Sequence, residues 1–351
     1  MLRPEQITQE LFELNRKLTN GMATLSKIGR VEVEASPKDP VFREDKLVLY
    51  RYRPRREQVS TVPLLIVYAL VNRPYMTDLQ EDRSIVRGLL DQGIDLYLID
   101  WGYPDGADRF LDLYDYVNRY IHRCVDLVCK RHDLPSINLL GICQGGTLSL
   151  CYAALHPEKV RNLITMVTPV DFHTPDNTLS QWYRDLDVDL MVDTLGNIPG
   201  ELLNWSFLSL KPFRLTGQKY VDMADIIEDE DRLKNFLRME KWIFDSPDQP
   251  GEMFRQFIKY FYQQNRLIKG TLKIGGRNVD LKQIKMPVLN IYATEDHLVP
   301  PSASIPLEKY IGSKDYSTIA FKGGHIGIYV SSRSQKEIPT AIAEWLQTRS
   351  K

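Results

Sequence analysis

The segment GICQGG at residues 141–146 constrains the fold of this chain more than any other feature. It follows the apolar run 137–142 and precedes a helix-favouring run at 147–155. A strand, a tight turn and a helix in this order form a nucleophile elbow, which lifts the middle residue of G-x-nucleophile-x-G above the sheet edge. Side chains at Gly141 and Gly145 would clash in such a strained turn. The sequence therefore predicts Cys143 as a nucleophile, although a buried cysteine in an ordinary glycine-rich turn is the alternative.

Short runs of β-forming residues alternate with helical patterns along much of the chain. The runs are 31–35, 46–52, 64–69, 95–100, 137–142, 162–167, 288–294 and 316–321. Apolar residues at three- and four-residue steps predict helices over 7–25, 113–129 and 336–348. Strands that alternate with helices predict a mostly parallel sheet with helices on both faces.

The alternation breaks between about residues 175 and 276, a stretch rich in aromatic residues and Asp that is predicted to be mostly helical. It lies between the sixth and seventh predicted strands. A long insertion at the C-terminal end of a strand usually covers a site there, so we expect a cap; a packing subdomain without a gating role is the alternative. The predicted domains are a core in two parts, 1–174 and 276–351, and a cap subdomain at 175–275.

The expected partners of Cys143 occur later in the chain. In a nucleophile-elbow protein the acid and then the histidine follow the nucleophile. Asp296 comes just after the strand 288–294, and His325 follows the strand 316–321. This order predicts an α/β-hydrolase fold with a Cys143, His325 and Asp296 triad and a largely helical cap inserted before the seventh strand. Glu295 is a competing acid, and His297 is either an accessory imidazole or a packed neighbour.

Two backbone amides are predicted to form an oxyanion hole. The N–H of Gln144 opens the helix after the nucleophile, and a second N–H near Val71, uncertain by one residue, lies in the loop after the strand 64–69. The alternative for that loop is simple packing against the cap. A helix N-terminus and a neighbouring histidine would both favour the thiolate form of Cys143.

Composition excludes several other classes of function. The net charge is −1, so no basic excess exists for nucleic-acid binding. No apolar run is long enough to span a bilayer, and no secretory signal is visible. Four cysteines in 351 residues are typical of reduced thiols in a cytoplasmic protein. Neither CxxC nor HExxH occurs, so we expect no metal and no cofactor.

Several segments together resemble the catalytic subunit of polyhydroxyalkanoate synthases, most closely the two-component type called class III. The segments are YALVNRPY (68–75), DLQ (78–80), LIDWG (98–102), the GICQGG box, EDH (295–297) and GGHIG (323–327). The likeness covers essentially the whole chain. It implies polymerisation of (R)-3-hydroxyacyl groups from coenzyme A thioesters, chiefly 3-hydroxybutyryl-CoA, with release of CoA. It also implies a homodimer, a separate small subunit and attachment to the surface of polyester granules.

Some alternatives remain open in the sequence. Asp296 either orients His325 or, as proposed for the resembled family, helps to activate the attacking 3-hydroxyl. A cysteine-dependent hydrolase of the dienelactone hydrolase kind also has a G-x-C-x-G-G box, although those enzymes lack a large insertion before the acid. The predicted helix at 7–25 contacts the granule, the partner subunit or its own domain. Large cap residues such as Trp182, Trp205 and Trp242 are candidates to restrict the pocket.

Overall fold

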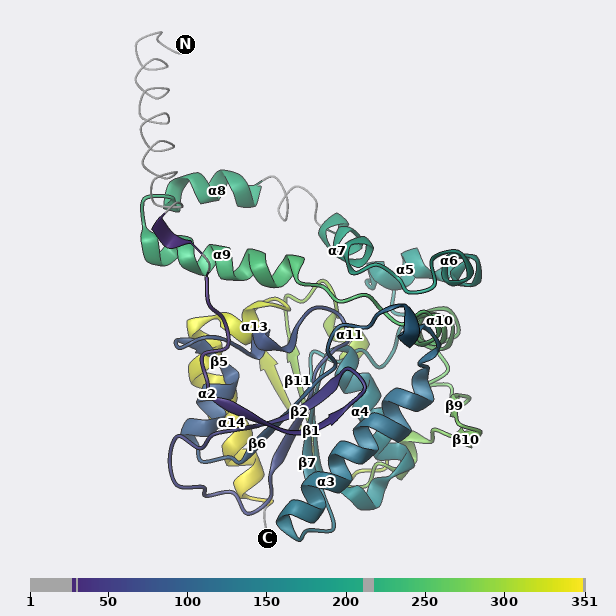
Figure 1. Cartoon of the computed structure of the whole chain (residues 1–351). Coiled ribbons are helices and arrows are strands. Elements are labelled where there is room, and N and C mark those ends of the chain that lie inside the picture. The colour runs from purple at the N-terminus through teal and green to yellow at the C-terminus, as the bar shows by residue number, and fades with distance from the viewer. Residues whose placement is uncertain (1–26, 30, 211–217, 350–351) are drawn as a thin grey trace.

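An eight-stranded sheet forms the centre of the computed structural model, which describes residues 27–29, 31–210 and 218–349 (Figure 1). In spatial order its strands are β1 (Lys38–Glu44), β2 (Leu47–Tyr52), β6 (Leu96–Asp100), β3 (Leu64–Val67), β7 (Ile137–Ile142), β8 (Val160–Met166), β11 (Val288–Ala293) and β12 (Tyr316–Phe321). β1 and β2 pair antiparallel with each other, and β2 pairs antiparallel with β6; the other neighbours are parallel. The predicted mostly parallel sheet is therefore present.

Helices cover both faces of this sheet, as the alternating pattern predicts. One face carries α2 (Ile85–Asp91), α13 (Gly327–Val330) and α14 (Ser332–Gln347), and the other carries the π-helix η3 (Asp115–Ile121), α3 (His122–His132) and α4 (Gln144–Leu155) (Figure 1). Successive residues of a strand point to opposite faces, so Leu65 and Val67 join the α3–α4 core while Leu64 and Ile66 join the α2–α14 core. The two cores hold the strand ends in place.

The remaining short elements connect these layers. They are η1 (Pro74–Thr77), β4 (Asp78–Gln80), β5 (Arg83–Ser84), η2 (Gly106–Phe110), η4 (Pro157–Lys159), β9 (Lys273–Ile274), β10 (Arg277–Asn278), η7 (Leu281–Gln283), α11 (Pro301–Ser304) and α12 (Leu307–Tyr310).

The prediction of a strand at 31–35 is wrong, and the edge strand β1 was not predicted. Residues 31–35 form no ladder. Instead, Lys241 and Arg238 of a later helix donate to the carbonyls of Val31 and Glu32, at 3.2 and 2.9 Å. The alternating VEVEA segment therefore contacts a helix. Local periodicity cannot distinguish an extended segment that contacts a helix from one that pairs with a strand. The predicted helix at 7–25 lies outside the described residues.

The helical insertion, residues 175–275, lies between β8 and β11. Its helices are α5 (Thr178–Arg184), α6 (Val188–Leu195), α7 (Gly200–Ser209), α8 (Lys219–Ile226), α9 (Glu230–Phe244), α10 (Gly251–Phe257) and the π-helix η6 (Ile258–Gln263). Figure 1 shows α5 to α9 above the sheet. Val188, Val192, Ile198 and Leu203 pack with Phe254 and Ile258 in a small core of their own, whereas Phe257 and Phe261 join the core beneath α4. Among the described residues, no helix has the length and apolar character needed to cross a membrane.

Candidate active site

Cys143 occupies the turn between β7 and α4, as the GICQGG segment predicts. Its backbone has φ 54° and ψ −124°, a conformation that residues with a side chain rarely adopt. The turn is held on both sides: the Cys143 N–H donates to the Met166 carbonyl at 2.9 Å, and its carbonyl accepts from the Gly146 N–H at 2.9 Å. Cys143 is half-buried and lines a cavity. The strained turn thus presents the sulfur at the C-terminal edge of the sheet.

The flanking glycines are required by close packing around this turn. A Cβ on Gly141 would lie 2.6 Å from the Ser149 hydroxyl oxygen, and one on Gly145 would overlap the carbonyl oxygens of Val67 and Tyr68. The close neighbours are thus the first turns of α4 and the end of β3. The lack of a side chain at these two glycines therefore lets α4 and the end of β3 pack closely against the turn. This close packing allows the helix to begin directly after the nucleophile.

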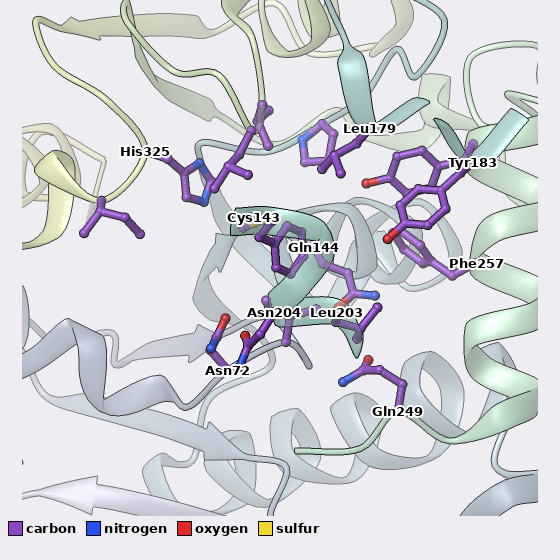
Figure 2. Close-up of a pocket in the computed structure, with 18 of the residues that line it drawn as sticks. Asn72, Cys143, Gln144, Leu179, Tyr183, Leu203, Asn204, Gln249, Phe257 and His325 are labelled. Atoms are coloured by element: carbon purple, nitrogen blue, oxygen red, sulfur yellow. The ribbon is translucent and has the colours of Figure 1, made fainter. Parts of the chain in front are cut away.

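His325 and Asp296 come together from the loops after β12 and β11. The two side chains are joined by a 2.7 Å hydrogen bond between His325 Nδ1 and Asp296 Oδ2. The other Asp296 oxygen accepts from the amides of Leu298 and Val299, at 2.8 and 2.9 Å. Asp296 is 5% exposed, whereas Glu295 is exposed to solvent. The structure therefore pairs the histidine with Asp296 and leaves Nε2 for Cys143, which Figure 2 shows next to the His325 ring.

The surroundings of His325 favour its protonated form. Burial of the ring lowers its pKa, but the charge of Asp296, the Cys143 sulfur and the hydrogen bonds to both outweigh burial and raise the pKa of His325 to about 10. The ring also packs against Tyr329 with its centroid 6.0 Å away and the planes 73° apart. An imidazole of raised basicity is suited to accept a proton from a thiol.

The two predicted oxyanion amides belong to Val71 and Gln144, next to Leu70 and Cys143 in the chain. The N–H of Leu70 donates to the Gln144 side-chain oxygen at 3.0 Å, so it is occupied. Within the part of the chain that the structure describes, the amides of Val71 and Gln144 have no protein acceptor. Both residues line the same cavity as Cys143. The pair is therefore available to a carbonyl oxygen of a bound molecule.

The cavity above Cys143 has a volume of about 210 Å³ and a mostly apolar wall. The helical insertion forms the roof of the cavity (Figure 2). The floor residues are Tyr68, Ala69, Val71, Asn72, Cys143, Gln144, Pro169, His297, Leu298, Val299, His325 and Ile326. The roof residues include Leu179, Tyr183, Leu203, Asn204, Phe207, Leu208, Trp242, Gln249, Phe254, Phe257, Ile258 and Tyr262. Such a wall favours an apolar acyl group and offers water few hydrogen-bond partners.

The tryptophans singled out from the sequence lie in different places. Trp242 lines the cavity, but Trp182 and Trp205 are exposed and do not line it. The aromatic wall consists instead of residues such as Tyr183, Phe207 and Phe257. Sequence reasoning missed these because aromatic content alone does not show which side of a helix faces inward.

The VNRPY and LIDWG segments are bound to each other. Arg73 donates to Asp100 Oδ2 and to the Gly102 carbonyl, both at 2.7 Å, and its guanidinium lies 4.2 Å from the centre of the Tyr103 ring. Arg73 and Asp100 are both nearly buried, so each needs the other as partner. These contacts fix the loop that carries Val71.

The other three cysteines do not line the cavity. Burial raises the pKa of the Cys124, Cys129 and Cys151 thiols, which keeps them protonated and unreactive. In the described ranges, no group of three or more His, Cys, Asp or Glu side chains is arranged to hold a metal ion.

Comparisons with known proteins match both the fold and the sequence. A family profile described as the alpha/beta hydrolase fold matches residues 62–332, and one described as the poly-beta-hydroxybutyrate polymerase (PhaC) N-terminus matches residues 5–89. The poly(3-hydroxyalkanoate) polymerase subunit PhaC of Allochromatium vinosum is 63% identical over 99% of each chain. The subunit of the same name from Synechocystis sp. is 52% identical over 98% of this chain and 94% of its own.

A solved structure with the same fold is Rv0554 from Mycobacterium tuberculosis. It has a TM-score of 0.55 and is 15% identical, covering 90% of this chain and 99% of its own. At that identity the likeness concerns the fold alone, and with the family profile it confirms the predicted α/β-hydrolase fold.

Proposed function

Because the chain belongs to the family of the poly(3-hydroxyalkanoate) polymerase subunit PhaC, we propose that it polymerises (R)-3-hydroxyacyl groups and releases coenzyme A. The proposed substrate is chiefly 3-hydroxybutyryl-CoA. One observation carries the proposal beyond the family: Cys143 stands on a strained elbow beside the His325–Asp296 pair, at the floor of an apolar cavity.

In the first step Cys143 takes over the acyl group. His325 Nε2 accepts the thiol proton, the sulfur attacks the thioester carbonyl, and the carbon–sulfur bond to CoA breaks. The proton then goes to the departing CoA thiolate. The amides of Gln144 and Val71 hold the oxyanion, and each donor contributes about 3 kcal/mol to lowering the barrier. Because one thioester replaces another, this exchange is nearly balanced in free energy.

In the second step the acyl group on Cys143 is attacked by a 3-hydroxyl group of another hydroxyacyl unit. An ester forms, the bond to the Cys143 sulfur breaks, and the hydroxyl proton returns through His325 to the sulfur. Water must be kept from the acyl-enzyme for the chain to grow. The apolar roof meets this need, so we assign residues 175–275 as a cap subdomain over a core made of 1–174 and 276–351.

The assembly proposed for this chain follows the family. The word subunit in the names of its relatives indicates a synthase of two components, so we propose a separate small subunit as partner. A homodimer and a location at the surface of polyester granules in the cytoplasm belong to the same proposal.

The test is to incubate the protein with 3-hydroxybutyryl-CoA, with and without a candidate small subunit, while following thiol release and turbidity. We expect CoA and insoluble polymer from the unchanged protein. Cys143→Ala should release no CoA, whereas Cys129→Ala, which alters a thiol outside the cavity, should retain turnover. Free hydroxy acid in place of polymer, or ordinary turnover by Cys143→Ala, would contradict the proposal.

A further inference from the structure

Asn204 is a buried polar residue of the cavity whose side chain the mechanism above does not use. It lies on α7, is 5% exposed and lines the cavity together with Cys143. Neither its amide nitrogen nor its amide oxygen has a hydrogen-bond partner in the described parts of the chain. Both atoms remain accessible from the cavity, since neither is among the fully enclosed atoms that lack a partner.

The other carboxamides of the cavity wall are tied to the backbone. Asn72 donates to the carbonyls of Trp242 and Ile243, at 3.3 and 3.2 Å. Gln249 donates to the Leu70 carbonyl at 2.9 Å, and Gln144 accepts from the Leu70 N–H. These three side chains hold loops and helices together. In Figure 2 the Asn204 carboxamide is drawn beside that of Asn72, below Cys143. Unlike the other three side chains, it forms no hydrogen bond with another described residue.

A carboxamide kept without a partner in an apolar wall indicates a polar atom on the bound molecule, because an unmatched buried amide is unfavourable. A hydroxyacyl thioester has two polar groups near its reacting carbon. Its carbonyl oxygen belongs to the amides of Gln144 and Val71. Its 3-hydroxyl both donates and accepts, and a carboxamide offers one acceptor oxygen and two donor hydrogens.

We infer that Asn204 is a substrate-binding residue that hydrogen-bonds the 3-hydroxyl group of the acyl chain bound at Cys143. The inference rests on the proposed function, since it names the group that the same site recognises. The hydrogen bond would select hydroxyacyl over plain acyl thioesters, because a site built to pair with a hydroxyl is left unmatched by an analogue that lacks it.

The test compares two substrates that differ only in this hydroxyl, 3-hydroxybutyryl-CoA and butyryl-CoA. Their dissociation constants are measured on the Cys143→Ala protein, where no chemistry intervenes, with and without Asn204→Leu. We expect Asn204→Leu to weaken binding of 3-hydroxybutyryl-CoA about tenfold and to leave butyryl-CoA within about twofold. In the protein that keeps Cys143, kcat/KM for 3-hydroxybutyryl-CoA should fall by at least the same factor.

The inference is overturned if Asn204→Leu weakens both ligands equally, which would mean that Asn204 only shapes the cavity, or if it weakens neither. The butyryl-CoA measurement shows in the same experiment that the altered cavity is still folded. Asn235→Leu makes the same substitution on α9, outside the cavity lining, and should change neither constant. If the unchanged protein makes polymer while Asn204→Leu shifts nothing, this inference fails and the proposed function stands.

Discussion

At the scale of single residues, the surroundings of Asp296 distinguish between the two roles that the sequence leaves open, which are orientation of His325 and activation of the attacking 3-hydroxyl. Its two carboxylate oxygens are fully engaged, one by His325 and the other by the amides of Leu298 and Val299. Its side chain is completely buried and is not part of the cavity wall. A carboxylate enclosed in this way cannot meet the 3-hydroxyl of a substrate directly. The geometry thus favours orientation of His325 over direct activation of the hydroxyl.

Replacing Asp296 with Asn tests this interpretation. Because acylation and elongation both need a correctly oriented His325, we expect both rates to fall together, by about 10³-fold or more. Rapid-quench measurement of the first CoA released, followed by polymer formation, separates the two steps. Normal acylation combined with a lost elongation step would show that Asp296 acts on the hydroxyl after all.

At the scale of elements, the C-terminal end of α9 is fastened to the loop that follows β3. The Trp242 indole N–H donates to the Arg73 carbonyl at 2.8 Å. Asp245, which ends α9, accepts from the hydroxyls of Tyr75 and Tyr103, at 3.0 and 2.7 Å. With the bonds from Asn72 already described, these contacts join the roof of the cavity to the loop that carries the Val71 amide. Movement of α9 would therefore disturb the oxyanion hole.

Removing the Asp245 carboxylate should loosen this junction. Asp245→Ala leaves two tyrosine hydroxyls without their acceptor, so we expect a loss of about 1–3 kcal/mol in the free energy of unfolding and faster hydrogen exchange at the end of α9. Asp193→Ala is the matched control, because it removes an exposed carboxylate of α6 whose partner Arg255 keeps Asp189. Unchanged exchange in α9 of the Asp245→Ala protein would mean that other contacts hold the roof.

At the scale of the whole molecule, the proton on His325 links stability to pH. The folded protein raises the pKa of this imidazole from 6.5 to about 10, so the folded state binds the proton more tightly than the unfolded chain does. The resulting stabilisation is fully present below about pH 6.5 and is lost as the pH rises through about 10.

This linkage predicts a decline in stability across that pH window. Urea unfolding of the unchanged protein should show a steeper loss between pH 6.5 and 10 than unfolding of the Asp296→Asn protein, because the neutral carboxamide provides no charge to hold the proton. Equal slopes for the two proteins would place the pKa of His325 near its ordinary value.

How far the sequence predicts the structure depends on how local each determinant is. The elbow at Cys143 follows from glycines and a strand–helix boundary within ten residues, and the buried strands β7 and β8 follow from short runs rich in β-branched residues and Leu. The strand expected at 31–35 fails because its partner is a helix about two hundred residues away. The inward side of α7 could not be predicted, because apolar side chains occur all around it: Leu203 is buried while Trp205 is 64% exposed. Asn204 was missed for the same reason.

The sheet topology also has an evolutionary consequence. β8 and β11 are hydrogen-bonded neighbours, with Leu163 opposite Val288, although the helical insertion separates them in the chain. Because the two strands run parallel, the chain leaves β8 at the C-terminal edge of the sheet, passes through the insertion and returns to the opposite edge to enter β11. Since the two flanking strands are paired with each other, a change in the length of the inserted segment would cost the framework little, because the entropy of closing a loop rises only slowly with its length. A lineage could thus exchange the roof for another and acquire new substrates while inheriting the same reactive floor.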